Sequence, residues 1–165
     1  MCYDSARMNF VPAFSLILPD IRSCHNVGAM FRTADACGVG QIYLVGYTPT
    51  PPRPQIDKVA LGAELWVPWK QYASLKRLIR ELKKKDIQIV ALERTEDSID
   101  IATADFAKPL ALIVGNEVDG IPKDILVLCD FVVHIPMRGR KESLNVSIAA
   151  GIGMYMIGKS GILDT

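Results

Sequence analysis

The first of three polar, glycine-containing stretches in this chain is NVGAMFR, which suits the binding of an anion. Asn26 is expected to cap a helix, Gly28 lies in the first turn and Arg32 follows four residues later. Because helical side chains lean toward the N-terminus, Arg32 is expected to lie over Gly28 and reach the helix start. Backbone N–H groups and the helix dipole favour an anion there, so Asn26 and Arg32 are predicted to hold a phosphate. Pairing of Arg32 with Asp20 or Asp35 is the structural alternative.

The second stretch is VGNEVDGIP. Gly115 and Gly120 permit a close backbone approach or a positive φ, and Glu117 between them follows an apolar run. The chain has no G-x-G-x-x-G after a strand, and GVGQIYLVG precedes a strand instead. A dinucleotide-binding dehydrogenase is therefore not expected.

The third stretch is IPMRGRKESLN, where three cations come before the cap-type residues Ser143 and Asn145. It is either an ordinary charged surface loop or a loop that holds a ligand at a helix N-terminus. Small residues follow inside the predicted helix: Ala149, Ala150, Gly151 and Gly153. Two glycines in one helix cost about 1 kcal/mol each, which close packing against another backbone, such as a second subunit, would offset.

These stretches need a scaffold, and the apolar pattern indicates an α/β domain with a mostly parallel sheet. The predicted strands are nearly continuous in apolar residues, as in a sheet covered on both faces: 14–18, 41–45, 88–92, 110–114 and 131–135. The predicted helices lie near 26–37, 71–85, 122–129 and 143–157. Pro122 is assigned to a first turn, Gly38 and Gly158 to helix ends, and 47–55 to a proline-rich loop. In such a sheet, ligands bind beyond the carboxyl ends of the strands, where the polar stretches are placed.

Composition bounds the class of protein. The 165 residues are expected to form one domain, with half of them hydrophobic and a net charge of +1. Residues 1–85 carry 12 Lys/Arg and 6 Asp/Glu, whereas residues 86–165 carry 7 and 12, which indicates an anionic partner on part of the surface. The basic segment 76–85 by itself is better interpreted as a solvated helix face.

The cysteines and the apolar runs bear on location. We expect neither a signal peptide nor a membrane-spanning segment, because the apolar run FVPAFSLIL is too short to cross a bilayer and lacks a basic lead-in. The four cysteines lack CxxC spacing, so reduced thiols in the cytoplasm are expected and no metal site is predicted. The cysteines are Cys2, Cys24, Cys37 and Cys129.

The segments NVGAMFRTA, LIVGNEVDGIP and IPMRGRKESLNVSIAAG resemble the three ordered motifs of the SpoU-type (TrmH-like) RNA ribose 2′-O-methyltransferases of the SPOUT superfamily. DKVALGAELWVPW resembles the segment that these enzymes carry between the first two motifs. The resemblance runs from about 14 to 157. It implies a single SPOUT domain over 1–165, with a deep trefoil knot at about 110–160. It also implies S-adenosylmethionine bound in the knot, tRNA or rRNA as substrate, and a homodimer through the C-terminal helix with active sites at the subunit interface.

The resemblance also assigns residues. The catalytic set is Asn26, Arg32, Glu117, Ser143 and Asn145. The cofactor-binding set is Leu92, Glu93, Gly115, Asn116, Glu117, Ile135, Met137, Ser143 and Leu144. The RNA-binding set is Arg22, Arg32, Arg53, Arg138 and Arg140, with the 76–85 helix as a further candidate for phosphate contact. Because arginine stays protonated, we expect Arg32 to bind a phosphate and stabilise the developing alkoxide, unless Glu117 shares its proton.

Two departures from the family pattern stand out. Val118 occupies a position where the family often has glycine, so the path of that loop is open. The chain begins almost at its first strand, so it resembles the minimal members, and RNA contacts are expected from the catalytic domain and its dimer.

Two other functions are weighed. One is a dimer of the same fold that binds RNA without catalysis, against which the complete set of polar motif residues argues. The other is a hydrolase using Cys24 or Cys37 with His25, for which no third member of a triad is evident.

Overall fold

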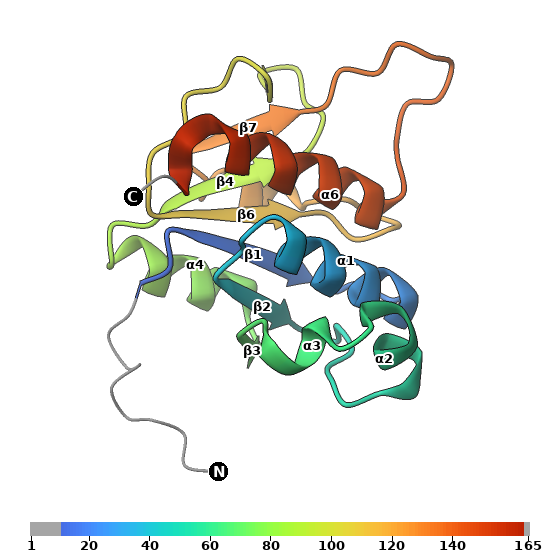
Figure 1. Ribbon diagram of the computed structural model, residues 1–165. Coiled ribbons are helices and arrows are strands. Elements are labelled where there is room, and N and C mark those ends of the chain that lie inside the picture. Colours follow the sequence, from blue (N-terminus) through green and yellow to red (C-terminus); the bar gives the residue numbers. More distant parts are fainter. Residues whose placement is uncertain (1–10, 164–165) are drawn as a thin grey trace.

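The core of the protein is a parallel sheet, which the computed structural model describes within residues 11–163. Its seven strands follow the order β3-β2-β1-β6-β4-β7-β5, and all paired neighbours are parallel (Figure 1). The strands are β1 (Phe14–Pro19), β2 (Gln41–Val45), β3 (Trp69–Tyr72), β4 (Gln88–Leu92), β5 (Ile99–Asp100), β6 (Leu110–Val114) and β7 (Phe131–His134). The predicted parallel α/β fold is confirmed. The trefoil knot is implied by the fold of the resembled family and stays a prediction.

All five strands expected from the sequence are present. They could be predicted because strands buried on both faces leave continuous apolar runs in the sequence. β2, β4 and β6 have the predicted bounds, β1 continues to Pro19, and β7 ends at His134, one residue early. The sequence pattern does not reveal β3 and β5. β3 is an edge strand with an exposed middle, and β5 has only two residues.

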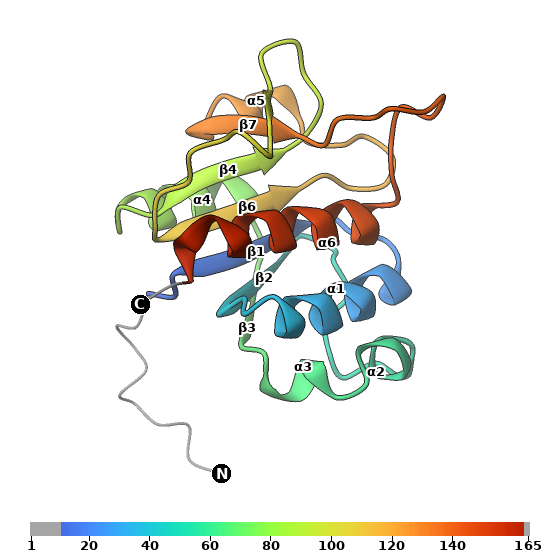
Figure 2. The same ribbon diagram turned by 45° about the horizontal axis from the view of Figure 1, so that its top comes forward.

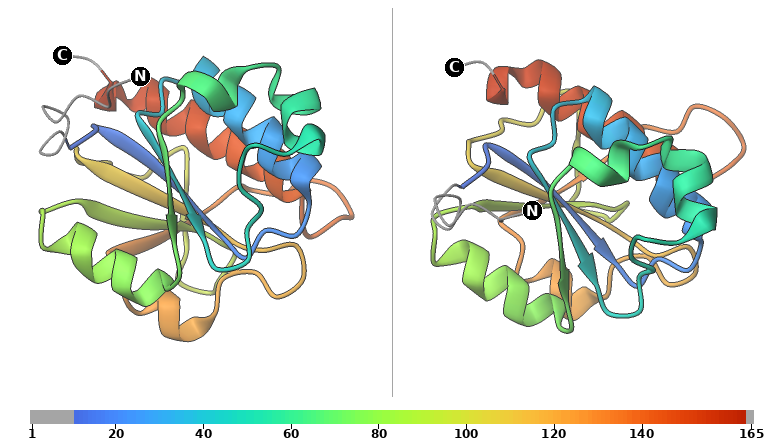
Figure 3. Two further views of the ribbon diagram at one scale, coloured as in Figure 1. Left: turned by 90° about the horizontal axis from the view of Figure 1, so that it is seen from below. Right: turned by 60° about the horizontal axis from the view of Figure 1, so that its bottom comes forward.

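Helices cover both faces of the sheet. α1 (Cys24–Ala36) and α6 (Val146–Ile157) lie on one face, with α4 (Leu75–Lys83) and α5 (Lys123–Leu126) on the other (Figure 3). α2 (Pro54–Ala60) and α3 (Ala63–Trp66) lie beyond α1 (Figure 2). Successive strand residues serve opposite faces: Leu112 joins the core under α1 and α6, and Ile113 joins the core under α4 and α5. In residues 11–163 no helix combines the length and apolar character needed to cross a bilayer.

The strand register brings three loops together. Leu92 at the end of β4 pairs with Val114 of β6 on one side and with Val133 of β7 on the other. All three strands run in the same direction, so the segments after them leave the same edge of the sheet side by side (Figure 1). This edge is where the second and third polar stretches lie.

Several helix boundaries differ from the prediction. Asn26 does not cap α1: Ser23 does, and its hydroxyl accepts the Asn26 N–H at 3.2 Å. The cap comes earlier because Ser23 already supplies a side-chain acceptor, which leaves the Asn26 side chain for a tertiary contact. Gly38 has φ +70° and follows the end of α1, as predicted. Asn145 caps α6, accepting the Ser147 N–H at 2.8 Å, which confirms its predicted position at the mouth of that helix.

Other boundaries shift because turn residues decide them. The predicted helix at 71–85 begins only at Leu75, after β3 and the cap Ser74. α2 already starts at Pro54, inside the expected proline-rich loop, since proline suits a first helical turn. Pro122 is the residue just before the short α5. Gly158 keeps helical angles, and the left-handed residue is Gly161 with φ +87°.

Gly28 lets α1 and α2 pack closely. A Cβ at this position would lie 2.6 Å from the backbone oxygen of Ile56 and 3.0 Å from the Cβ of Val59. The space over Gly28 is therefore filled by α2. The expectation that the stem of Arg32 lies over Gly28 is wrong, because backbone already occupies that place.

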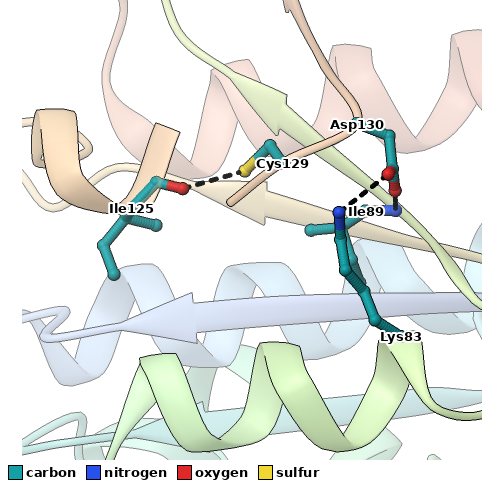
Figure 4. Close-up of polar contacts among 5 residues, drawn as sticks. All are labelled: Lys83, Ile89, Ile125, Cys129 and Asp130. Atoms are coloured by element: carbon teal, nitrogen blue, oxygen red, sulfur yellow. Dashed lines mark hydrogen bonds and ion pairs between the residues drawn. The ribbon is translucent and has the colours of Figure 1, made fainter. Parts of the chain in front are cut away.

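Asp130, the residue just before β7, joins the start of that strand to β4. Its backbone N–H donates to the Ile89 carbonyl at 2.8 Å, and its Oδ2 accepts the Ile89 N–H at 2.7 Å (Figure 4). The other carboxylate oxygen accepts from Lys83 at 2.8 Å. Beside it, Cys129 donates to the Ile125 carbonyl, and burial raises the pKa of that thiol to about 11. Cys129 is thus a protonated packing residue.

Candidate active site at the carboxyl ends of β4, β6 and β7

A cavity of about 960 Å³ lies at the edge where β4, β6 and β7 end. Its walls come from the segments after these strands and from the start of α6. All nine residues of the predicted cofactor-binding set line it: Leu92, Glu93, Gly115, Asn116, Glu117, Ile135, Met137, Ser143 and Leu144. Contact of these residues with a cofactor stays a prediction. The fold does bring together the three segments that carry them, which follow β4, β6 and β7.

The loop between β6 and α5 is closed by its own backbone. Asn116 and Gly120 exchange two backbone hydrogen bonds, each 3.3 Å long. The Asn116 side chain accepts the N–H groups of Val118 and Asp119 at 2.9 and 2.8 Å. A Cβ on Gly115 would lie 2.7 Å from Gly120, so glycine is required for this closure. Val118 needs no glycine, because its φ is not positive and its side chain is 61% exposed.

One polar network joins the three motif segments. Asn26 donates from Nδ2 to Oε1 of Glu117 at 2.9 Å and accepts at Oδ1 from Nδ2 of Asn145 at 3.3 Å. Asn145 Oδ1 accepts from both the hydroxyl and the backbone N–H of Ser147. Each amide therefore has a defined orientation. Asn26 is 7% exposed, so the cost of leaving its amide unpaired would fix this arrangement.

Glu117 is held as a carboxylate at the start of α1. Besides Asn26, it accepts the backbone N–H groups of Arg22 at 3.1 Å and Ser23 at 3.4 Å. Partial burial acts to raise its pKa, but these hydrogen bonds outweigh burial and keep the pKa below its ordinary value. The anion at the start of α1 is thus the protein's own carboxylate, and the predicted phosphate position beside Asn26 is wrong.

Arg32 lies elsewhere. Six residues from Asn26 amount to a rise of about 9 Å and a turn of about 120° around the helix. Arg32 is exposed and borders a shallow hollow between α1 and α2 with His25, Gln55 and Lys58. It does not border the large cavity. In residues 11–163 it forms no ion pair, so the predicted alternative with Asp20 or Asp35 is also wrong.

None of the predicted RNA-binding arginines lines the large cavity. Arg22, Arg138 and Arg140 are exposed, with Arg22 beside Glu117 and the other two on the segment from β7 to α6. Arg53 is also exposed and precedes α2. The basic α4 is less available, because it covers the opposite face and much of its charge is paired. Its ion pairs are Lys76–Asp124, Arg77–Glu81 and Lys83–Asp130.

Residues that the sequence analysis did not select also border the cavity. His134, the last residue of β7, bonds through Nδ1 to the Ser98 hydroxyl at 3.0 Å. Because that hydroxyl donates to the Thr95 carbonyl at 2.7 Å, His134 must be the donor in the contact. Inspecting only residues after each strand misses this last strand position.

The alternatives with cysteine or metal gain no support in the described part of the chain. Burial raises the pKa of Cys37, which opposes a thiolate there, and His25 borders the hollow with Arg32. Within residues 11–163 no three His, Cys, Asp or Glu residues gather to hold a metal. Cys2 lies outside the described residues.

The cavity fits S-adenosylmethionine by size and by lining. Its volume is in the range of small-molecule sites. Leu92, Ile135 and Leu144 offer an apolar surface for a purine ring. The carboxylates on its walls outnumber the cations, which suits a ligand with a sulfonium and an ammonium group. The carboxylates are Glu93, Glu117, Asp119 and Glu142, and the cations are Arg94 and Lys123.

Comparison with known proteins identifies the same segments. The SpoU rRNA Methylase family matches residues 13–155. The TrmH-family protein YacO of Bacillus subtilis is 34% identical over 160 residues, covering 94% of this chain and 62% of YacO. The tRNA (guanosine(18)-2′-O)-methyltransferase of Thermus thermophilus is 33% identical over 144 residues, covering 87% of this chain and 73% of that enzyme.

A solved structure has a similar fold. The AdoMet-bound rRNA methyltransferase from Sinorhizobium meliloti superposes with a TM-score of 0.83 at 31% identity. The match covers 88% of this chain and 56% of that one. The chain thus spans less than two thirds of the length of YacO and of the Sinorhizobium enzyme. On the extent of the family match and the identity to these relatives, the chain belongs to the SpoU rRNA methylase family.

Proposed function

We propose that this chain catalyses the transfer of a methyl group from S-adenosylmethionine to a ribose 2′-hydroxyl of tRNA or rRNA. The observation that carries the proposal is the network Glu117–Asn26–Asn145, which ties α1 and α6 to the loop of a cavity suited to the cofactor. The Thermus relative acts on a guanosine 2′-hydroxyl of tRNA, and the Sinorhizobium structure is an AdoMet-bound rRNA enzyme.

In this proposal the protein chiefly aligns the reactants. S-adenosylmethionine would supply an activated methyl group, and the segments after β4, β6 and β7 would hold it in the cavity that Ser143 and Asn145 also line. These two polar side chains line the same cavity and would position the ribose. Glu117 keeps Asn26 and the cavity loop in place. It is a poor candidate for the proton acceptor, because its lowered pKa leaves it a weak base.

Arg32 acts, we propose, on the cavity of a second copy in a homodimer. It is exposed and stands outside the cavity of its own chain. The neighbouring α6 exposes Ile148 (55%) and Tyr155 (62%), seven residues apart and thus on one face, where a second copy would cover them. Across such an interface the guanidinium would bind a phosphate of the RNA and stabilise the developing alkoxide.

Mixing two inactive variants tests the action of Arg32 in trans. Arg32→Ala removes the guanidinium, and Gly115→Val disrupts the cavity loop. In a mixed dimer the intact cavity of the first variant faces the Arg32 of the second, so about a quarter of the wild-type rate returns on random mixing. Mixtures that stay inactive, although mixed dimers form, overturn the arrangement.

The activity itself is tested with radiolabelled cofactor and bulk tRNA and rRNA, followed by nucleoside mass spectrometry. We expect label in a 2′-O-methylnucleoside and retention of cofactor binding in Arg32→Ala. Incorporation into a base instead of ribose contradicts the reaction proposed. RNA binding without any incorporation would replace it with the role of a non-catalytic RNA-binding dimer.

A further inference from the structure

Glu93 connects two of the three loops that form the cavity. It directly follows β4, and its carboxylate reaches the end of the loop between β6 and α5. Oε2 accepts the backbone N–H of Ile121 at 2.9 Å, and Oε1 accepts the N–H of Arg94 at 2.9 Å. Both carboxylate oxygens are therefore engaged with backbone.

Gly120 and Gly115 leave room for the contact between Glu93 and Ile121. Gly120 has φ +65°, and a Cβ there would overlap Oε2 of Glu93. A Cβ on Gly115 would in turn collide with Gly120. Glu93, Gly120 and Gly115 thus form a stack in which a carboxylate occupies the space that the missing side chain of Gly120 leaves free.

A second carboxylate ties the same loop to α1. Glu117, which lies within the loop, accepts backbone N–H groups from the start of that helix. The middle of the loop is closed by Asn116. The Glu93 contact fastens the residue with which the loop ends, Ile121, to the neighbouring β4 segment. Releasing it frees one wall of the cavity without touching the strands.

We propose that Glu93 is a positioning residue: its carboxylate fastens the 115–121 loop and thereby sets the affinity for S-adenosylmethionine. The inference rests on the proposed function for the identity of the ligand. Under this inference Glu93 stabilises the loop already in the cofactor-free protein. A residue that only contacts the cofactor would have an effect only in the bound state.

Glu93→Gln tests this in the full-length chain. Glutamine keeps the shape but has one acceptor oxygen where Glu93 has two, so one backbone N–H loses its partner. We expect amide hydrogen exchange at Ile121 and 116–120 to become about tenfold faster in the cofactor-free protein. Calorimetry should show about tenfold weaker cofactor binding, with kcat at saturating cofactor and RNA affinity unchanged. Glu96→Gln is the matched control, because it removes the same charge from an exposed position on the same connection.

A second variant addresses the same contact from the other side. Gly120→Ala places a methyl group against Oε2 and also strains a residue of φ +65°, so it should accelerate the same amides. The part of its effect that comes from Oε2 should be absent once Glu93 is replaced, so the effects of Gly120→Ala and Glu93→Gln should be less than additive. Unchanged exchange in cofactor-free Glu93→Gln, together with weaker cofactor binding, would make Glu93 a direct ligand and overturn the inference. If the wild type neither bound the cofactor nor transferred methyl groups, the proposed function would fail, while the exchange measurement would still decide whether Glu93 holds the loop.

Discussion

Asn26 donates its side-chain amide to Oε1 of Glu117 across 2.9 Å, although 91 residues separate the two in sequence. The contact links the third residue of α1 to the loop that connects β6 with α5. Its direction is fixed, because the oxygen of the same amide accepts from Asn145. A helix of one motif, the loop of a second and the helix cap of a third are thereby held in one arrangement. Single substitutions in this network separate its structural role from catalysis.

Asn26→Asp should destabilise the protein more than Asn26→Ala does. The new carboxylate would face Glu117 and would have no proton to donate, which costs about 2 to 3 kcal/mol at neutral pH against about 1 to 2 for alanine. Repulsion raises the pKa of the pair, so the extra loss should fade as the pH falls and one carboxyl is protonated. Urea unfolding of both variants at pH 7 and pH 4 measures this. An aspartate variant as stable as the alanine variant at pH 7 would contradict the contact.

Glu117→Gln should cost stability only above the acidic range. Burial opposes ionisation of Glu117, but its hydrogen bonds leave the folded-state pKa below the ordinary value of 4.5. The stabilisation is therefore fully present above about pH 4.5 and is lost as the pH falls through the lowered pKa. Because the side chain is only partly buried and remains open to solvent, we expect a difference of only about 1 kcal/mol from wild type. Asp119→Asn in the same loop is the control, and a difference independent of pH would be the contrary result.

Much of the cavity could be predicted from the sequence, because the relevant signals are local. Apolar runs located the five central strands, and parallel pairing places the loops after these strands at one edge. Residue type alone indicated a close backbone approach or a positive φ at Gly115 and Gly120, and a helix cap at Asn145. The motif resemblance then selected nine residues that all line one cavity.

The surroundings of the Arg32 side chain could not be predicted from the sequence, because they depend on a tertiary contact between α1 and α2. Spacing correctly placed Arg32 and Gly28 on one side of α1. It could not show that α2 packs over Gly28, since the segment 54–60 carries no strong helical signal and begins inside a proline-rich stretch. Likewise, the Ser23 cap and the distant partner Glu117 together decide what Asn26 does, and neither can be derived from the spacing of the first motif.

Asp130→Asn should weaken folding without affecting methyl transfer. The substitution keeps one acceptor for the Ile89 N–H but removes the charge that Lys83 contacts at 2.8 Å. We expect a loss of about 1 kcal/mol, and of about 2 for Asp130→Ala, which also leaves the Ile89 N–H without its side-chain acceptor. Lys83→Met should cost less than either, since the pair is partly exposed. Thermal unfolding and the methylation rate of each variant decide this, and a fall in kcat at unchanged cofactor affinity would count against a purely structural role.

Gly28→Ala and Gly151→Ala form a matched pair on the two helices that cover the same face of the sheet. At Gly28 the new Cβ would lie 2.6 Å from the Ile56 carbonyl, so α2 must move, at a cost of about 1 to 3 kcal/mol. At Gly151 the nearest atom of the same chain outside α6 is Thr33 Cγ2 at 3.5 Å, so within one chain the better helix propensity of alanine should make the change neutral or stabilising by up to about 1 kcal/mol. Displacement of α2 also alters the hollow that Arg32 borders, so Gly28→Ala should lower methyl transfer while cofactor binding in the large cavity is retained. Equal melting temperatures for the two variants would show that α1 and α2 are not in the close contact described, and with it the placement of Arg32 would have to be revised.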